Sequence, residues 1–429
     1  MSMELKKYRL SEIIETFIPG DWGEESSSSE YPNAVRCVRG ADIVPIWNSD
    51  YDHIPIRYIS NRSFANKQLK VGDIIIEKSG GSPTQSTGRT AFVSEELISN
   101  AKHLVCTNFC TAFRIKPGWN PKYVYYYLQH LYNNDVFFNF EGKTSGLKNL
   151  QIENAFDKAT ITQIPIEKQN QIVKVLDTLD RKIALNRAIN RNLEALAKQL
   201  YDYWFVQFDF PDENGRPYKS SGGKMVWNEV LKREVPKGWI CKTINEIESC
   251  IITGKTPPTA DEMNYGGTIP FITIDDIRQS LFVYSTERTL SKKGADSQMK
   301  KYLPKGSLCC SCIGTVGIIG FVGKKSQTNQ QINSIIFHED FHRVFLIFSL
   351  KMYFQYANAK TGNILSNMNK EEFSAIKMMY PSINLLKSFH NFVMPLFQQI
   401  DSNIIELQCL TKQRDELLPL LMNGQVTIE

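Results

Sequence analysis

The stretch TSGLKNLQIENAFDKATITQIP, residues 144–165, decides how this chain is organised, because a related stretch, TGNILSNMNKEEFSAIKMMYP, follows at 361–381. Both begin with a threonine near a glycine, continue through a short amphipathic segment and end at a proline. A long segment with a helical pattern follows each of them directly. Such an internal repeat predicts two homologous domains in one chain.

The repeat extends toward the N-terminal side of both stretches and keeps its order. At one constant offset, the matching segments are RLSEIIETFIPG (9–20) with TINEIESCIITG (243–254), VRGADI (38–43) with ITIDDI (272–277), and LKVGDIIIEKSG (69–80) with LPKGSLCCSCIG (303–314). Thr107-Asn108 then matches Thr328-Asn329 at a shorter offset, as expected when loops differ in length. Each copy alternates short β-rich runs with turns and ends in a helical stretch, so we predict two α+β domains.

These patterns divide the chain into five parts. We predict a first domain at 1–164, a helical segment at 165–209, a polar surface linker at 210–235, a second domain at 236–380 and a second helical segment at 381–429. The linker is rich in proline, glycine and serine, which favours a flexible connection.

The two helical segments carry apolar residues at alternating steps of three and four, the spacing of a heptad seam. The seam includes Leu176, Leu179, Ile183, Leu193 and Leu200 in the first segment, and Ile400, Leu407 and Leu417 in the second. We predict two long antiparallel helices that form a coiled-coil spacer between the domains. The alternative is that each helix packs only on its own domain.

Polar residues interrupt the middle of each seam: Asn186 and Asn190 in the first, Asn403 and Arg414 in the second. Buried asparagine at such positions costs stability and fixes the register of the partner helix. Pro395 and Pro419 predict a kink or a restart in the second helix.

Composition indicates a globular protein: 429 residues, 42% hydrophobic and 22% charged, with a net charge of +5. No apolar run reaches the ~18 residues of a membrane span. Nine cysteines at irregular spacing predict reduced thiols and a cytoplasmic protein. Cys309 and Cys312 form a C-x-x-C without a second pair at a zinc-site distance, so we expect no metal there. The positive excess lies in 236–380, which weakly favours a nucleic-acid partner.

One catalytic pattern occurs: HEDFH (338–342) fits the H-E-x-x-H of zinc hydrolases, which requires one continuous helix. The repeat aligns it with RIKPGWNPK (114–122), whose prolines and glycine exclude such a helix. We therefore expect His342 in a loop or at a helix start. No phosphate loop, dinucleotide fingerprint or nucleophile elbow is present. We expect a binding protein with no catalytic residues and no cofactor, and zinc hydrolysis stays as an alternative.

Two polar loops offer groups that can contact DNA. The loop 77–92, EKSGGSPTQSTGRTAF, is an exposed glycine-rich turn, and 311–331 is its counterpart in the second copy. Glutamine suits adenine, arginine suits guanine, and lysines and small hydroxyls suit phosphates. The candidates are Lys78, Ser82, Thr84, Gln85, Arg89, Thr90, Lys143 and Lys148 in the first copy, and Thr315, Lys324, Lys325, Asn329 and Gln330 in the second. The alternative is that these loops are ordinary solvated turns.

Four stretches together resemble the specificity subunit of type I restriction–modification systems: LKVGDIIIEKSGGSPTQSTGRTAF (69–92), NRNLEALAKQLYDYWFVQFDFP (190–211), PKGW (236–239) and KQRDELLPLLMNGQV (412–426). The resemblance covers nearly the whole chain. The second copy departs from it because it has no counterpart of Ser-Pro-Thr-Gln (82–85).

The resemblance implies two target-recognition domains that bind a bipartite double-stranded DNA site, one half-site per domain, with the helix pair setting the spacer. It implies as partners two methyltransferase (modification) subunits that use S-adenosylmethionine. Restriction (translocase and nuclease) subunits that use ATP would join through that methyltransferase core. The subunit itself would be non-catalytic, without cofactor or membrane contact. A stand-alone DNA-binding or adaptor protein without restriction partners is the alternative.

Overall fold

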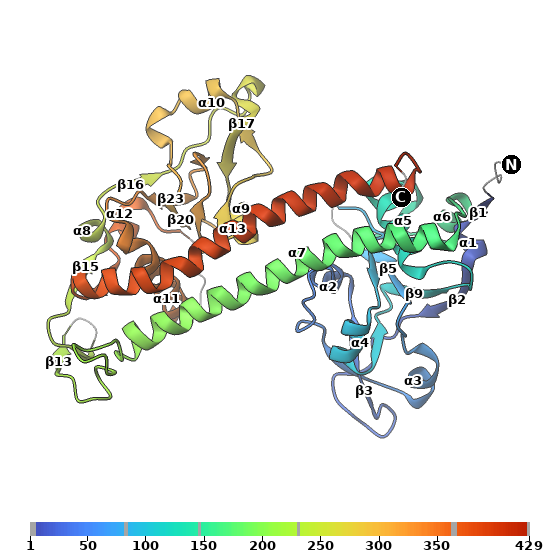
Figure 1. The fold of residues 1–429 in the computed structure, drawn as a ribbon, viewed down its shortest axis with the longest axis horizontal. Helices are drawn as coiled ribbons and strands as arrows, with labels where there is room; N and C mark the ends of the chain where they lie inside the picture. Colours follow the sequence, from blue (N-terminus) through green and yellow to red (C-terminus); the bar gives the residue numbers. More distant parts are fainter. Residues whose placement is uncertain (1–5, 81–84, 145–146, 230–231, 362–366, 427–429) are drawn as a thin grey trace. The chain divides into compact units, whose positions relative to one another are not determined.

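The computed structural model describes residues 6–80, 85–144, 147–229, 232–361 and 367–426. It divides into two compact units, residues 1–187 with 407–429, and residues 188–406 (Figure 1). Each unit holds one α/β domain and part of two long helices, α7 (Ile166–Tyr201) and α13 (Ile383–Met422). None of the helices in the described part of the chain combines the length and apolar character that a membrane span requires.

The first domain is built on small sheets. The main sheet has the order β2-β9-β5-β7, formed by Ile14–Pro19, Cys110–Ile115, Ile74–Glu77 and Thr90–Phe92. A second has the order β4-β3-β8, formed by Ile56–Ile59, Asn33–Val38 and Leu104–Cys106. A third has the order β10-β11-β6, formed by Glu141–Thr144, Leu147–Leu150 and Ser79–Gly80. Strand β1 (Lys7–Arg9) pairs antiparallel with β12 (Thr160–Thr162), which joins the start of the domain to its end.

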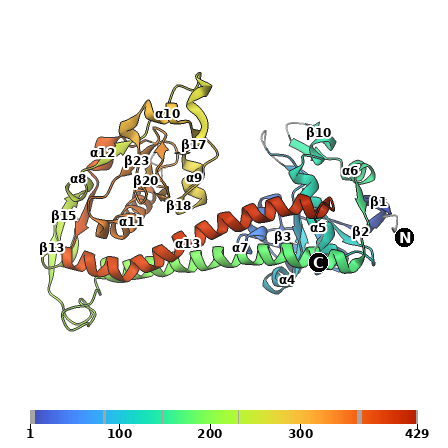
Figure 2. The same ribbon diagram turned by 45° about the horizontal axis from the view of Figure 1, so that its top comes forward.

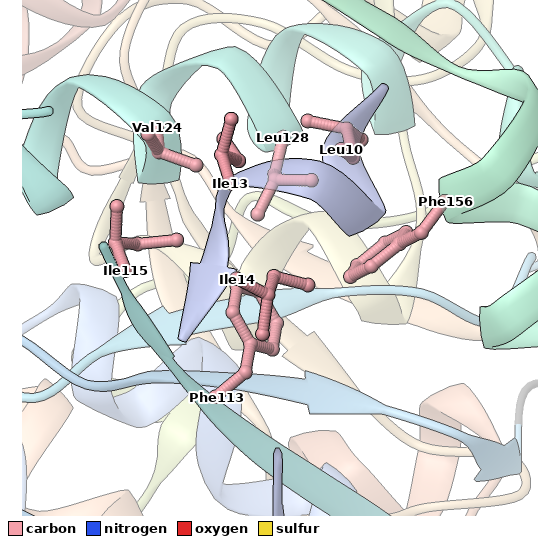
Figure 3. A pocket seen from close by; sticks show the side chains of 8 residues that line it. All are labelled: Leu10, Ile13, Ile14, Phe113, Ile115, Val124, Leu128 and Phe156. Atoms are coloured by element: carbon pink, nitrogen blue, oxygen red, sulfur yellow. The ribbon is translucent and has the colours of Figure 1, made fainter. Parts of the chain in front are cut away.

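The described residues of the first domain also form the helices α1 (Leu10–Ile13), α2 (Ile43–Trp47), α3 (Asn61–Lys67), α4 (Glu95–Ala101), α5 (Pro121–Asn133) and α6 (Ile152–Lys158). Its core forms where α1, α5 and α6 meet the main sheet. There the side chains that converge are Leu10, Ile13, Ile14, Phe113, Ile115, Val124, Leu128 and Phe156 (Figure 3). The space among them is too small for a water molecule. Burial of each such side chain contributes about 1.5–3 kcal/mol before the entropy of folding is subtracted.

The second domain repeats this plan. Its main sheet has the order β16-β23-β20-β21-β18, formed by Ile251–Thr253, Ile332–Ile335, Leu308–Ser311, Ile319–Val322 and Phe282–Val283. A second has the order β19-β17-β22, formed by Thr289–Leu290, Tyr265–Ile272 and Gln327–Thr328. Strand β15 (Ile240–Thr243) pairs antiparallel with β24 (Lys377–Tyr380). Its α-helices are α8 (Ile244–Ile247), α9 (Ile274–Gln279), α10 (Lys292–Asp296), α11 (Arg343–Thr361) and α12 (Lys370–Ser374).

The two domains share one topology. In each, the first strand pairs with the last strand before the long helix, in β1–β12 and in β15–β24. In each, the second sheet contains one parallel pair, β3–β8 and β17–β22. The repeat predicted from the sequence is therefore confirmed, and so is the fold class of two homologous α/β domains with two long helices.

The long helices run antiparallel inside each unit (Figure 2). In the second unit Asn190 of α7 bonds to Asn403 of α13, and Trp204, in the helical turn that follows α7, packs on Phe389 with ring centroids 5.4 Å apart. In the first unit Arg414 of α13 donates a hydrogen bond to Asp180 of α7. Residues later in α7 therefore contact residues earlier in α13, so the two helices are antiparallel.

The heptad seam predicted from the sequence is the buried face of both helices. Leu176, Ile183 and Ile400 are at most 1% exposed. The other apolar seam residues are half-buried: Leu179, Leu193, Leu200, Leu407 and Leu417. The restart considered at Pro395 and Pro419 does not occur, because α13 is one continuous helix of 40 residues.

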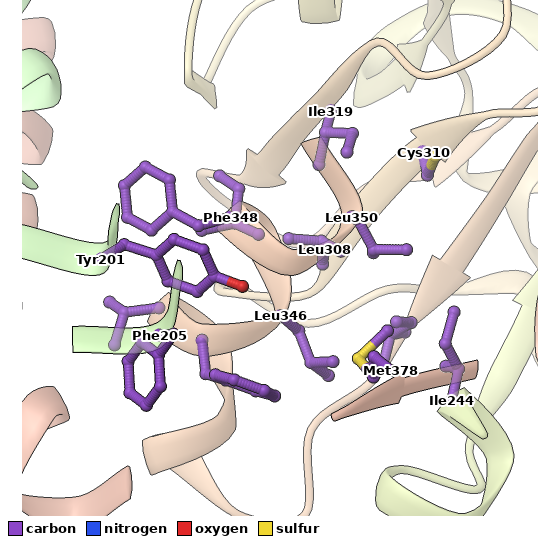
Figure 4. Packing of buried hydrophobic residues seen from close by; sticks show 14 of the residues in the cluster. Tyr201, Phe205, Ile244, Leu308, Cys310, Ile319, Leu346, Phe348, Leu350 and Met378 are labelled. Atoms are coloured by element: carbon purple, nitrogen blue, oxygen red, sulfur yellow. The ribbon is translucent and has the colours of Figure 1, made fainter. Parts of the chain in front are cut away.

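The end of α7 belongs to the core of the second unit. Tyr201 and Phe205 lie against α11, with the Tyr201 and Phe348 rings 5.4 Å apart (Figure 4). The Tyr201 hydroxyl lies 2.9 Å from the Ser349 hydroxyl. The chain then continues into a hairpin of β13 (Met225–Asn228) and β14 (Arg233–Pro236). Strand β13 and β14 up to Val235 lie in the segment 210–235 that the sequence predicts as a linker, and Pro236 is the first residue after it.

Candidate nucleic-acid interface

The two domains hold their Thr-Asn loops by similar backbone bonds that are displaced by one residue, since the donor is Thr107 in the first domain and Asn329, the neighbour of Thr328, in the second. The backbone N–H of Thr107 donates to the carbonyl of Val38 at 2.9 Å, and that of Asn329 donates to the carbonyl of Ile272 at 3.2 Å. Val38 and Ile272 are themselves matching positions of the repeat. Each loop is therefore fixed to the second sheet of its domain.

A glycine packs against each of these loops. A Cβ on Gly20 would lie 1.9 Å from the carbonyl oxygen of Thr107, and one on Gly254 would lie 2.1 Å from that of Asn329. No larger residue fits without moving the backbone. The repeat matches Gly20 to Gly254, so the close approach explains why both copies need glycine there.

Directly after each Thr-Asn pair of the sequence stands an exposed residue, which we call the tip residue: Phe109 in the first domain and Gln330 in the second. The backbone contacts are displaced by one residue, because the carbonyl that accepts the N–H of Cys312, the match of Lys78, is that of Gln331. Phe109 is 56% exposed, and its carbonyl accepts the backbone N–H groups of Lys78 (2.8 Å) and Ser79 (3.0 Å). Gln330 is exposed and its Oε1 accepts the Thr256 hydroxyl at 2.5 Å. Sequence reasoning missed Phe109 because it is apolar, although its place after the matched Thr-Asn pair marks it.

The described ends of the glycine-rich loop of the first domain are joined by a buried ion pair between Glu77 and Arg89. Arg89 donates from Nε to Oε2 of Glu77 at 2.9 Å and from Nη2 to Oε1 at 2.6 Å. Their side chains are 11% and 2% exposed. The hydrogen bonds from Arg89 to Glu77 raise the pKa of the guanidinium, so Arg89 is a fixed cation. The neighbouring Thr90 is 1% exposed, and its side chain points into the protein.

A second buried carboxylate, Glu141, orders the same loop. Its Oε1 accepts the backbone N–H of Thr87 at 2.6 Å and the Thr87 hydroxyl at 2.9 Å. Lys148 lies 3.6 Å from its Oε2 and donates to the carbonyl of Gln85 at 3.1 Å. Lys148 and Gln85 therefore hold the loop together, while Lys78 is exposed. Ser82, Thr84 and the side chain of Lys143 lie outside the described residues.

Strand register decides which candidates of the second domain share an end of the sheet. Cys310 pairs with Asn333, so the segments after β20 and before β23 meet at one end. That end carries Thr315, which is exposed, and the loop with Asn329 and Gln330. Asn329 is half-buried and donates to Oε1 of Gln331 at 2.9 Å.

Lys324 and Lys325 belong to the opposite end of this sheet, because Leu308 pairs with Phe321 and the chain leaves β21 there. Both lysines are exposed, and the Lys325 ammonium lies 4.1 Å above the Tyr302 ring. The structure therefore separates Lys324 and Lys325 from the other three candidates. In the first domain Lys78, Gln85 and the tip residue share one end, because Glu77 pairs with Cys110.

The H-E-x-x-H pattern has a structural role. Residues Asp340–His342 form a short 3-10 helix directly before α11, which confirms the expected break between the two histidines. The Nδ1 atoms of His338 and His342 lie 3.0 Å and 2.7 Å from the carboxylate of Glu248. Nε2 of His342 lies 2.8 Å from the Tyr380 hydroxyl. The described residues contain no group of three His, Cys, Asp or Glu side chains that could hold a metal ion.

The nine cysteines are free thiols, six of them buried. Burial raises the pKa of Cys309 to about 12, which keeps this thiol protonated. Cys309 and Cys312, the C-x-x-C pair, lie in and directly after β20 as core side chains.

Comparison with known proteins agrees with the repeat. Residues 5–195 and 236–406 both match the family described as type I restriction modification DNA specificity domain. The type I restriction enzyme HindI specificity subunit of Haemophilus influenzae is 30% identical, over 92% of this chain and 95% of its own length. The MjaIX specificity subunit of Methanocaldococcus jannaschii is 25% identical, over 96% and 95%.

The fold is also similar to a solved structure. The crystal structure of a type I restriction–modification S subunit from M. genitalium has a TM-score of 0.55 and 14% identity, covering 98% of this chain and 96% of that one. The two matched segments each contain one domain and the part of a long helix that follows it. The chain therefore belongs to the family of type I restriction–modification DNA specificity proteins.

Proposed function

We propose that the chain reads a bipartite double-stranded DNA target for a type I restriction–modification system, one half-site per recognition domain. The observation that carries this proposal is the pair of tip residues. Both domains hold a corresponding loop on a common scaffold, with the loop contacts displaced by one residue, and the exposed side chains are Phe109 in one domain and Gln330 in the other. A common scaffold with different exposed side chains is what two readers of different sequences need.

The chemistry of the tips suggests what each reads. The apolar ring of Phe109 can contact the methyl group of thymine, and the Gln330 amide can bond to both the N6 and N7 edges of adenine. Lys78, exposed beside Phe109, suits a phosphate. Thr315 and Asn329 accompany Gln330 in the second domain. The loop is held in place by the bond from Lys148 to the carbonyl of Gln85 and by the ion pair of Arg89 with Glu77.

Partners follow from the family. Two methyltransferase subunits and, through that methyltransferase core, restriction subunits would supply the chemistry with S-adenosylmethionine and ATP. This chain would contribute recognition alone, without a cofactor, and would act in the cytoplasm, where such systems meet DNA. The recognition domains would be residues 1–164 and 236–380. The helices of 165–209 and 381–429 would set the spacer between half-sites, with 210–235 as the connection.

The test is selection of bound sequences by the full chain from a random double-stranded DNA library. We expect Phe109→Ala to relax the first half-site alone and Gln330→Ala to relax the second alone, each by about 1–3 kcal/mol at the base it reads. Lys324→Ala, at the opposite end of the second sheet, is the matched control and should leave both half-sites unchanged. Equal weakening of both half-sites by either tip variant would contradict the assignment of one half-site per domain.

A further inference from the structure

Each recognition domain has a polar contact with the long helix that follows it. In the second unit, Asp401 of α13 accepts the Tyr284 hydroxyl on Oδ1 at 2.6 Å and the Lys305 ammonium on Oδ2 at 2.8 Å. Lys305 also donates to the Tyr284 hydroxyl at 2.9 Å. Both carboxylate oxygens and the two side chains of the domain are therefore joined in one closed triad.

The domain is shaped to hold Tyr284 in this position. A Cβ on Gly323 would lie 2.7 Å from the Tyr284 ring, so the ring rests directly on the backbone after β21. Burial raises the pKa of Tyr284, which keeps its hydroxyl protonated and able to donate. The hydrogen bond that Lys305 donates to Asp401 raises the pKa of Lys305, which keeps the ammonium charged.

The first unit also has a polar contact between its domain and its long helix. Arg187 of α7 donates from Nη1 to the side-chain oxygen of Asn48. Asn48 follows α2 directly, and Tyr284 follows α9 closely, and the repeat aligns these two helices. Arg187 and Asp401 both lie roughly five to six turns from the start of their long helix, at ~3.6 residues per turn. A polar contact between domain and helix therefore occurs in both copies, at nearby but not identical positions of the repeat and with different chemistry.

The apolar contacts beside the triad lack this directionality. Phe397 of α13 lies edge-on to Phe282 and Phe321, with centroids 6.5 Å and 6.1 Å away. Such packing attracts over a range of angles, whereas a charge-assisted hydrogen bond needs one geometry. The polar triad is the element that can select a single orientation of the domain on its helix.

We propose that the Tyr284–Lys305–Asp401 triad and the Asn48–Arg187 contact are latches that fix each recognition domain on its helix and thereby restrict the spacer length the protein accepts. This inference rests on the proposed bipartite function. Helix length sets how far apart the domains start, and the latch sets the direction in which each loop end projects. Loosening a latch leaves the reading residues unchanged and broadens the range of spacers.

The experiment uses the full chain and a pool of DNA molecules with both half-sites fixed and the intervening length varied. The variant Tyr284→Phe keeps the ring and removes the hydroxyl. We expect it to bind more tightly than wild type to DNA whose spacer is one base pair longer or shorter than the preferred length. The expected gain, relative to the preferred length, is about threefold to tenfold, the equivalent of one net hydrogen bond. Lys305→Met should act in the same direction, and the half-site sequences should not change.

Asp275→Asn is the matched control, because it removes one carboxylate of an exposed ion pair with Arg278 in the same domain. It should keep the wild-type spacer profile. If Tyr284→Phe fails to fold, as judged by its thermal transition, Lys305→Met decides. A folded latch variant with the wild-type profile would overturn the latch. A wild-type protein that binds two half-sites no better than one would instead overturn the bipartite function.

Discussion

Asn403 on α13 donates a side-chain hydrogen bond of 2.8 Å to Asn190 on α7, inside the buried seam between the two helices. The two residues are 5% and 7% exposed. The side-chain oxygen of Asn403 accepts a hydrogen bond from Nε2 of Gln399 at 2.7 Å. In the first unit, Arg414 and Asp180 form the corresponding polar contact at 3.3 Å. Each unit thus contains a polar pair that is satisfied only when the two helices are in this register.

Replacement of one asparagine should cost more than replacement of both. Asn190→Leu leaves the amide of Asn403 short of a partner, with an expected loss of about 1–3 kcal/mol in the local stability of the helix pair. The double change to leucine should recover much of this loss, because no polar group is left unpaired. Hydrogen exchange of the α7 and α13 peptides measures both values. Additive losses would show that the two side chains are not coupled.

The ion pair under the glycine-rich loop should matter for stability as well as recognition. Arg89→Ala leaves the buried carboxylate of Glu77 unpaired, a change that costs about 3–5 kcal/mol in comparable buried pairs. We expect a lower unfolding midpoint for the first domain together with weaker reading of the first half-site. Lys78→Ala, an exposed change in the same loop, should weaken DNA binding at an unchanged midpoint. An Arg89→Ala protein of wild-type stability would show that the pair is not structural.

Acid should destabilise the second unit through Glu248. Burial alone raises the pKa of Glu248, but the hydrogen bonds from His342, His338 and the backbone of Glu339 outweigh it and hold the pKa below its ordinary value of 4.5. The folded state therefore binds a proton less readily than the unfolded chain. The stabilisation is present above pH 4.5 and is lost as the pH falls through the lowered value.

The role of the Glu248 charge can be tested by measuring the unfolding midpoints of wild type and Glu248→Gln from about pH 3 to about pH 7, a range that covers the titration of carboxylates. The difference between the two proteins should shrink as the pH falls. Glu262→Gln, at an exposed position, is the matched control and should follow wild type throughout. A difference that stays constant with pH would contradict the role of the Glu248 charge.

The helix pair can be tested as a spacer by lengthening it. Because α7 and α13 pair antiparallel, seven residues must be added to both, after Asn186 and after Glu406, to keep the seam in register. The insertion adds ~10 Å at ~1.5 Å per residue, about three base pairs of B-DNA at ~3.4 Å each. We expect the preferred spacer to grow by about that number while both half-site sequences persist. An unchanged spacer would exclude the helix pair as the determinant of spacing.

Thiol reactivity distinguishes core cysteines from a metal site. Cys409 is exposed and should react first with a thiol reagent, whereas the six buried cysteines should react only after unfolding. Burial raises the pKa of Cys37 and of Cys309 to about 12, which also makes these thiols unreactive in the folded protein. Zinc analysis of the purified protein completes the measurement, and stoichiometric zinc would revive the hydrolase alternative.

The fold could be predicted from the sequence to a large extent, because the repeat is a property of order and spacing. The matched pairs Gly20 with Gly254 and Val38 with Ile272 contact the corresponding loop in both domains, at loop positions that differ by one residue. The heptad seam was equally visible, since helical periodicity places Leu176 and Ile400 on one face whatever the partner is. The continuity of α13 through Pro419 was not visible, because surrounding contacts can hold a helix through a proline.

The candidate site could be predicted only in part. Loop composition identified Lys78 and Gln330, which the structure places at the surface. It also identified Arg89 and Lys148, whose charges serve Glu77 and Glu141, because charge in a sequence does not reveal whether a partner carboxylate lies nearby. Phe109 was missed since an apolar residue in a loop carries no signal of exposure.

The sequence by itself determined that this protein contains two copies of one domain, two heptad-patterned helices and membership of a DNA specificity family. The repeat and the helices depend on local periodicity and order, which the chain carries residue by residue, whereas the family rests on the resemblance of four stretches of sequence. Only the tertiary structure decided which end of each sheet gathers the polar loops, and that Lys324 and Gln330 lie at opposite ends. It also decided that Tyr284 and Lys305 meet Asp401, because contacts between residues far apart in the chain arise from packing and strand register.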